Sequence, residues 1–292
     1  MNKLKLNLAL ILALAGANFA KAQTYGVFNG ATQPTFWSYD LSVATGSLAA
    51  TSIDKIAISN SKSVDFLPAP TSATSRLYLP AGTGSKADVS GGALKLTATS
   101  SGSPLKFSTY DIADAKTVSS IFFDISFNGT RAKNGIIILG FGQNMPGQVF
   151  NNTNQILSTA ASTGLFGGLR LEFYGGDDIQ TYYRTSKFAN GNFEDFKTIF
   201  DRNADKQSVE IYCNNSAKNQ SYKRDNKKFK LPAKTFHVFV AGKQLVADGS
   251  SDIPATGELA VDQVINSIIF NTSSSTNNLL NFSISNLKVG GL

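Results

Sequence analysis

Short runs in which apolar and polar residues alternate recur along most of the chain. In 121–127 every odd position is apolar, and the polar residues Asp124 and Ser126 separate the apolar positions 123, 125 and 127. A period of two is typical of a β-strand with one face against a core. Residues 136–141 are apolar with almost no interruption, which predicts a strand buried on both faces. The pattern therefore predicts strands rather than helices.

Comparable runs continue toward both ends of the chain, separated by turn residues such as Asn128-Gly129 and Asp248-Gly249. They predict further strands at 93–99, 105–110, 169–174, 180–185, 197–200, 209–213, 236–240, 265–271 and 280–289. Only 193–200 and 262–265 offer a helical turn. Many short strands between turns, without a long helical period, predict an all-β fold, an antiparallel β-sandwich.

The first 22 residues read differently from the rest. Lys3 and Lys5 precede an apolar stretch at 6–16, and Ala20 and Ala22 occupy the positions that a signal peptidase reads. The apolar stretch is shorter than the roughly 20 residues of a membrane span. We therefore expect a signal peptide at 1–22, no membrane span, and a mature protein that is secreted, either to a periplasm or outside the cell.

The mature chain has two parts, which differ in how regularly apolar and polar residues alternate. Residues 23–90 carry several prolines and few clean alternations, so we expect an irregular N-terminal segment that wraps the sandwich. Residues 91–292 hold the regular strands and are expected to form the sandwich itself. No linker or internal repeat divides this part, which indicates one domain.

The net charge of +7 is concentrated in one place. One segment, 218–234, holds a single acidic residue, Asp225, and seven basic ones: Lys218, Lys223, Arg224, Lys227, Lys228, Lys230 and Lys234. Such a segment is either a solvated hairpin or a surface that binds an acidic glycan. A single patch on an otherwise nearly neutral, exported protein does not indicate nucleic-acid binding.

Cys213 and His237 are the only cysteine and histidine, which excludes multi-histidine zinc sites and thiolate clusters. Both lie in strand-like runs, and we interpret Cys213 as a small buried residue and His237 as a structural histidine. Asp177 and Asp178 follow two glycines and form either a plain turn or part of a structural calcium site. We expect no other cofactor.

The order of strands from about residue 88 resembles the concanavalin A-like lectin and glucanase superfamily of jelly rolls. The residues that carry the likeness lie at 91–96, 118–127, 134–141, 236–246, 265–271 and 282–289. The hairpin at 236–246 and the two runs after it are similar to the last strands of that family. The resemblance implies a concanavalin A-like jelly-roll sandwich and an association with carbohydrate, although a fold does not determine a function.

Enzymes of this fold require signatures that the chain largely lacks. Retaining glycosidases need two carboxylates about 5 Å apart, and the four glutamates here have no acidic partner two residues away on a strand. Polysaccharide lyases have Arg-x-Glu-x-x-Arg, of which Arg170 and Glu172 supply only the first half. A tyrosine, Tyr182, stands where such lyases have a histidine, and tyrosine can act as an acid and base.

The best candidate ligand-binding site lies on the two strands at 169–174 and 180–185. It consists of Arg170, Glu172, Tyr174, Gln180, Tyr182 and Arg184. If residues 176–178 form a three-residue hairpin loop, all six side chains share one sheet face. Arginine, carboxylate and flat rings suit a sugar, which stacks on rings and binds charged groups through its hydroxyls or carboxylate.

Two interpretations of this face stay open: a glycan site, or a solvent-facing strand with an Arg170–Glu172 ion pair. We expect a non-catalytic, lectin-like protein that binds a polysaccharide or other glycan, including an acidic one, on a concave sheet face. The alternatives are a polysaccharide lyase or glycoside hydrolase with a divergent site around Arg170, Glu172, Tyr182 and Arg184, and a surface or adhesion protein without catalytic activity.

Overall fold

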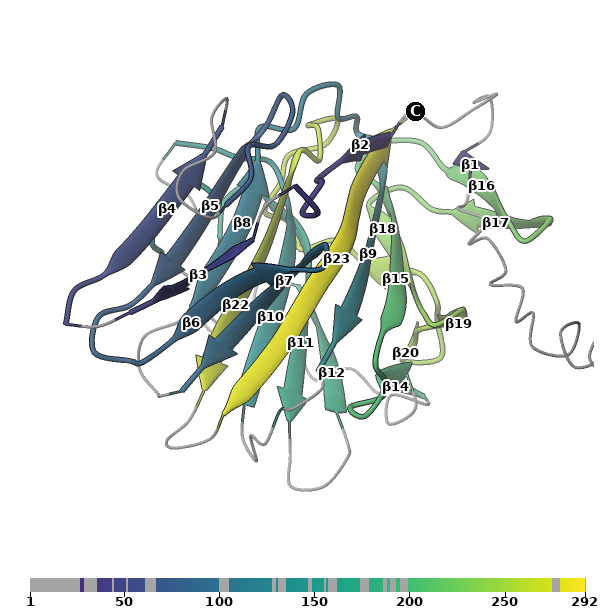
Figure 1. Cartoon of the computed structure of the whole chain (residues 1–292). Helices are drawn as coiled ribbons and strands as arrows, with labels where there is room; N and C mark the ends of the chain where they lie inside the picture. The colour runs from purple at the N-terminus through teal and green to yellow at the C-terminus, as the bar shows by residue number, and fades with distance from the viewer. Residues whose placement is uncertain are drawn as a thin grey trace, which may run out of the picture.

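The chain folds into two large antiparallel β-sheets stacked face to face, with smaller sheets at their margins (Figure 1). The computed structural model describes residues 27–28, 36–43, 45–50, 52–60, 67–99, 105–127, 130, 135–146, 149–154, 156, 162–173, 179–185, 188–189, 193–194, 199–274 and 279–291. The predicted signal peptide lies outside these residues. Among the described residues, no helix has both the length and the apolar character that crossing a membrane requires.

The first sheet has eight strands in the order β13-β12-β11-β10-β22-β8-β5-β4. Their bounds are β4 (Lys55–Ser59), β5 (Thr74–Leu79), β8 (Lys106–Tyr110), β10 (Gly135–Gly142), β11 (Leu165–Phe173), β12 (Ile179–Arg184), β13 (Phe188–Ala189) and β22 (Ser267–Ser274).

The second sheet has ten strands, with β19-β18-β15-β9-β23-β7-β6-β3 as its main path; β2 also pairs with β23, and β21 with β18. Their bounds are β2 (Phe36–Ser38), β3 (Gly46–Ala49), β6 (Lys86–Ser90), β7 (Ala93–Ala98), β9 (Val118–Ser126), β15 (Gln207–Asn214), β18 (Thr235–Val240), β19 (Lys243–Gln244), β21 (Ile253–Pro254) and β23 (Leu280–Gly291).

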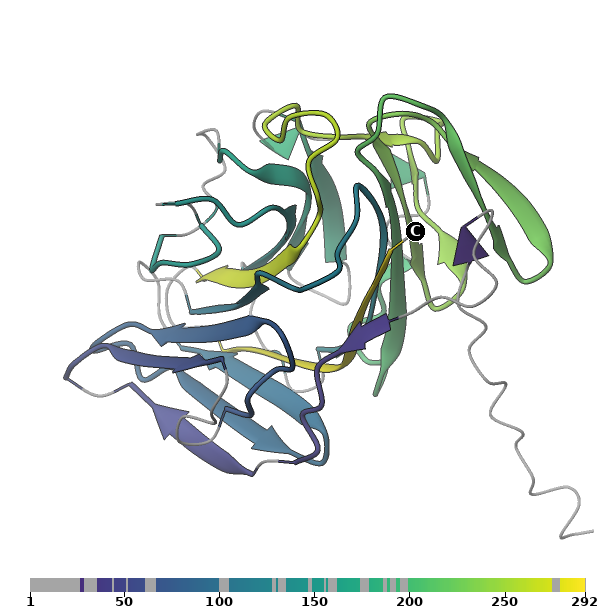
Figure 2. The ribbon, with the colours of Figure 1, turned by 90° about the horizontal axis from the view of Figure 1, so that it is seen from above.

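The remaining strands form two small sheets. One joins β1 (Val27–Phe28), β16 (Gln220–Arg224) and β17 (Lys227–Leu231), and the other pairs β14 (Phe193–Glu194) with β20 (Val246–Ala247). The hairpin of β16 and β17 projects beside the ten-stranded sheet, as the view from above shows (Figure 2).

The main core fills the space between the two large sheets. Ile121, Phe123 and Ile125 of β9 face it, and the ring of Phe123 meets that of Phe270 edge to face at 5.2 Å. The alternation predicted for 121–127 is thus confirmed. The opposite side of β9 is buried as well, because Phe122 belongs to a second apolar cluster beneath the β16–β17 hairpin.

The strand predicted at 136–141 corresponds to β10, and both of its faces are covered. Ile137 and Leu139 face the main core, whereas Ile138 packs in a third cluster on the outer face of the eight-stranded sheet, the face turned away from the ten-stranded sheet. The prediction of a strand buried on both sides is confirmed. The outer cover comes from residues 149–154 and from Ile156, which the sequence pattern did not indicate.

The segment before residue 91 is more regular than its sequence suggests. Strand β5 pairs with β8 in one large sheet, and β6 pairs with β7 in the other. Of the two expected helical turns, the one at 262–265 does not form, because 261–262 is a turn and no helix follows it. Residues 193–194 are strand β14 and residue 199 is helical, but 195–198 lie outside the described residues, so the helical turn expected at 193–200 stays a prediction. The predicted fold class, an all-β antiparallel jelly-roll sandwich, is confirmed by the strand order.

Candidate ligand-binding site

Strands β11 and β12 form the hairpin that carries the residues singled out in the sequence. Arg170 lies opposite Tyr182, Glu172 opposite Gln180, and Phe173 opposite Ile179. A loop of residues 176–178 would have placed Phe173 opposite Thr181, so the observed register differs by two residues. Because side chains alternate with a period of two, this shift leaves the paired residues of 169–173 and 179–183 on the faces expected for them.

Four of these side chains form one connected group, which we call the β11–β12 face: Arg170, Glu172, Gln180 and Tyr182. Arg170 Nη2 donates to Glu172 Oε1 at 2.7 Å, and its guanidinium carbon lies 5.2 Å from the centre of the Tyr182 ring. The Tyr182 hydroxyl donates to Gln180 Oε1 at 2.6 Å. The expected Arg170–Glu172 ion pair therefore forms, and both partners remain partly exposed.

Arg184 lies on the same face of the strand but is fully buried. Its Nη2 is 3.3 Å from Glu258 Oε1, in a segment held by the Thr256 amide, which donates to the Phe166 carbonyl at 2.8 Å. Burial raises the pKa of Glu258, and the guanidinium of Arg184 opposes that shift. The expected role of Arg184 as an accessible ligand-binding residue does not fit this position, because its side chain is fully buried beside Glu258.

The remaining predicted residues, Tyr174, Asp177 and Asp178, lie outside the described residues. The structural calcium site at Asp177 and Asp178 therefore stays a prediction. Within the described ranges, no group of three or more histidine, cysteine, aspartate or glutamate side chains is arranged to hold a metal ion.

The centre of the outer face is covered by residues 149–154, which we call the covering segment. Lys106 is fully buried, and its Nζ donates to the carbonyls of Val149, Asn152 (2.6 Å) and Asn154 (2.9 Å). Ser108 Oγ donates to the Phe150 carbonyl at 2.7 Å. Burial lowers the pKa of Lys106 to about 7. The hydrogen bonds to backbone carbonyls fix the covering segment on the sheet.

The apolar side of the covering segment matches the sheet beneath it. Val149 and Phe150 pack in a cluster with Ile138 of β10 and Ile269 of β22. This contact removes the middle of the outer face from solvent, so a ligand cannot lie across it. The face remains accessible on either side of the covering segment, at β11 and β12 and at β4 and β5, and the sequence alone could not place these boundaries.

The basic segment 218–234 forms the β16–β17 hairpin, and its charges differ in availability. Arg224 binds Glu210 through Nε–Oε2 and Nη2–Oε1, both at 2.9 Å, and its guanidinium lies 4.5 Å from the centre of the Phe239 ring. Lys223, Lys227 and Lys228 are exposed. Arg224 therefore anchors the hairpin to the sheet, and only the lysines offer charge to a partner.

His237 is buried between two polar partners. Its Nδ1 lies 2.7 Å from the Tyr222 hydroxyl, and its Nε2 lies 2.7 Å from Asp252 Oδ1. Burial lowers its pKa, and Asp252 opposes that shift. These contacts tie the β16–β17 hairpin to β18, which is a structural role.

Cys213 is fully buried, and burial raises the pKa of its thiol well above the usual value.

These observations define a jelly-roll sandwich with one partly exposed polar and aromatic face at β11–β12. No protein-family model matches the chain, and no curated protein matches its sequence.

Solved structures similar to this chain share the fold at low sequence identity. A protein of unknown function with a galectin-like fold from Bacillus subtilis is 12% identical, with a TM-score of 0.39 over 67% of this chain and 82% of that one. The legume lectin-like domain from Entamoeba histolytica is 10% identical, with a TM-score of 0.36 over 70% and 87%. Alginate lyase vAL-1 from Chlorella virus is 13% identical, with a TM-score of 0.35 over 74% and 89%. These similarities concern the fold alone, and the expected jelly-roll sandwich is the one that the strand order of the two sheets shows.

Proposed function

We propose that this protein is a secreted, lectin-like protein that binds carbohydrate at the β11–β12 face. One observation carries the proposal: a tyrosine ring, a guanidinium, a carboxylate and an amide are joined in one partly exposed network. The ring of Tyr182 offers a surface for the C–H groups of a sugar, while Glu172 and Gln180 offer oxygens to its hydroxyls. Their mutual contacts fix these groups before a ligand arrives, which lowers the entropic cost of binding.

The surroundings of the face limit the size of the ligand. The covering segment closes the sheet on one side, and at the far end of β12 Arg184 is buried beside Glu258. A long polysaccharide lying across the sheet would collide with the covering segment. The proposed ligand is therefore a short oligosaccharide or the end of a glycan chain.

The charge preference of this face depends on Arg170. Arg184 is buried against Glu258, so Arg170 is the arginine of the pair that a ligand can reach. Its guanidinium already binds Glu172, and an acidic sugar would have to compete with that carboxylate. We therefore propose neutral glycans as the principal ligands, with uronates accepted only where they displace Glu172 from Arg170.

Glycan-array binding of the mature protein, followed by analysis of the bound glycans for cleavage products, tests the proposal. Binding of short glycans without products supports it. Unsaturated or hydrolysed products would replace it with a lyase or a hydrolase, and an array without binding would favour a surface or adhesion protein without a glycan ligand.

A further inference from the structure

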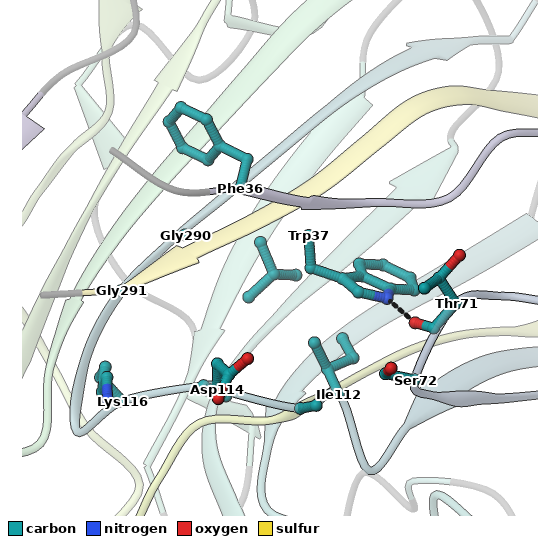
Figure 3. A pocket seen from close by; sticks show the side chains of 12 residues that line it. Phe36, Trp37, Thr71, Ser72, Ile112, Asp114, Lys116, Gly290 and Gly291 are labelled. Atoms are coloured by element: carbon teal, nitrogen blue, oxygen red, sulfur yellow. Dashed lines mark hydrogen bonds between the residues drawn. The ribbon is translucent and has the colours of Figure 1, made fainter. Parts of the chain in front are cut away.

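A cavity of about 500 Å³ lies where β2 runs beside the C-terminal end of β23. Figure 3 shows Phe36 and Trp37 on one side of it and Ile112, Asp114 and Lys116 on the other. None of these residues belongs to the β11–β12 face. The volume lies within the range of about 300–1,000 Å³ that is usual for small-molecule sites.

Trp37, the only tryptophan in the chain, is fixed in the wall of this cavity. Its Nε1–H donates to the Thr71 carbonyl at 2.5 Å, and its ring lies against that of Tyr39 at an interplanar angle of 25°. Because the N–H group already has a partner, the indole can offer a ligand only its ring surface. A rigid aromatic surface suits the C–H face of a sugar ring.

The opposite wall is a turn held by its backbone. The Ala113 amide donates to the Ser72 carbonyl at 2.9 Å, and the Lys116 carbonyl accepts from the Ile265 amide at 3.0 Å. Asp114 has a φ of 59°, in the left-handed region that aspartate tolerates better than most residues. The turn thus presents Asp114 and Lys116 at fixed positions on the rim.

Both rim side chains are exposed, and neither is in an ion pair with any residue that the structure describes. One charge is negative and the other positive, so the rim is neutral as a whole. An arrangement of this kind can bind hydroxyl groups from both sides, because the carboxylate accepts and the ammonium donates. It offers no net attraction to a strongly charged ligand.

Two glycines stand beside Val289 in the part of the wall contributed by β23. A Cβ atom on Gly290 would lie 2.6 Å from ring carbons of Phe36, and one on Gly291 would lie 2.5 Å from Lys116 Cγ. Only glycine allows Phe36 and Lys116 to approach the strand this closely. The absence of side chains at these two positions gives the cavity its present walls.

We propose that this cavity is a second binding site, which takes the pyranose ring of a neutral sugar. The ring would rest against Trp37 and the apolar side chains of Ile112 and Val289, with its hydroxyls at Asp114 and Lys116. The volume, the immobilised indole and the rim of balanced charge support this ligand class. The site stands on residues separate from Tyr182, so it does not depend on the function proposed above.

The single tryptophan provides a direct test. Mature protein is titrated with D-glucose, D-galactose and D-mannose while Trp fluorescence is recorded, with the open-chain polyol sorbitol as the comparison. We expect at least one pyranose to produce a saturable change in Trp37 emission and sorbitol to produce none. No response to the three pyranoses, or an equal response to sorbitol, would overturn the proposal.

Variants distinguish this cavity from other sites. Asp114→Asn keeps a residue that tolerates the left-handed backbone, and Lys116→Gln keeps the stem that packs on Gly291. Each should weaken the fluorescence-detected affinity about tenfold, as expected when a hydrogen bond to a charged group is lost. Asp111→Asn is the matched control, since Asp111 is in the same turn with a φ of 55° but does not line the cavity.

The Trp fluorescence response of the control variants shows whether the sugar binds in this cavity. The Asp111→Asn and Tyr182→Ala proteins should respond as the unmodified protein does. Equal weakening by Asp111→Asn and Asp114→Asn would overturn the proposal, and so would loss of the response in Tyr182→Ala. Glycan binding that requires Tyr182 without any Trp37 response would remove this cavity as a site and leave the proposed function standing.

Discussion

The guanidinium of Arg170 lies over the ring of Tyr182, and the two residues are direct neighbours across β11 and β12. The same guanidinium binds Glu172 on its own strand. One arginine therefore orients both a ring and a carboxylate on the outer face of the eight-stranded sheet. An ion pair in contact with solvent contributes only about 0–1 kcal/mol to stability, and both partners here are partly exposed, so the main consequence of this arrangement is the fixed geometry of the face.

The core prediction concerns strand β9. Phe123→Ala should lower the free energy of unfolding by about 3–5 kcal/mol, because it removes a ring packed against Phe270 and leaves a cavity. Asp124→Ala is the control; it loses a hydrogen bond from Asn286 and an ion pair with Lys206, and should cost about 1–2 kcal/mol. Urea unfolding measures both values. Equal losses would contradict the assignment of Phe123 to the main core.

The anchor of the β16–β17 hairpin gives a second prediction. Arg224→Met leaves the Glu210 carboxylate, which is 2% exposed, with the Tyr212 hydroxyl as its remaining side-chain donor among the described residues. We expect a loss of about 3–5 kcal/mol, as for other broken buried ion pairs. Lys223→Met on the same strand is exposed and should change stability by less than about 0.5 kcal/mol. Similar effects for the two variants in thermal unfolding would show that Arg224 is a surface charge.

The pH dependence of stability should reflect His237. Its pKa in the folded protein is below the unfolded value of about 6.5, so the unfolded chain binds the proton more readily. Stability should therefore fall as the pH drops from about 6.5 toward the folded pKa. Glu258 acts in the opposite direction, since its raised pKa favours the folded state on acidification.

The two groups can be separated by substitution. His237→Gln should flatten the loss of stability below about pH 6.5, as measured by unfolding at a series of pH values. Glu258→Gln should leave that loss in place. A slope that His237→Gln does not alter would mean that another group is responsible.

The covering segment depends on Lys106. Lys106→Met keeps an apolar stem in the sheet but leaves the carbonyls of Val149, Asn152 and Asn154 without this donor. We expect a loss of roughly 2–4 kcal/mol and faster amide exchange in 149–154 than in β10. Lys95→Met on β7, whose lysine is exposed, is the control. Unchanged exchange in the covering segment would show that Lys106 does not hold it.

The sequence was sufficient to predict which side chains face the core in strands whose two faces differ in polarity. The alternation at 121–127 placed Phe123 and Ile125 in the core because a one-residue slip would have turned them to the other side. Arg170 and Tyr182 shared a face for a related reason, since any odd loop length preserves that parity. The register itself could not be derived, because it depends on the turn between Phe173 and Ile179.

The local sequence pattern could not predict which side chains are buried by distant parts of the chain. Arg184 reads as an exposed strand residue, and its partner Glu258 is 74 residues away. Lys106 reads the same way, yet it is buried by carbonyls more than 40 residues further on. Phe122 was an available signal for a second covered face on β9, because it is apolar at an even position.

The most direct test of the proposed function is a calorimetric titration. A short glycan that the unmodified protein binds is titrated into the Tyr182→Ala protein. Tyr78→Ala is the matched control, because Tyr78 is a partly exposed tyrosine on β5 of the same sheet, on the far side of the covering segment. Loss of ring stacking in Tyr182→Ala should weaken binding by roughly 1–3 kcal/mol with little change in thermal stability, whereas Tyr78→Ala should bind normally. Equal affinity in the Tyr182→Ala and unmodified proteins would contradict a carbohydrate site at the β11–β12 face.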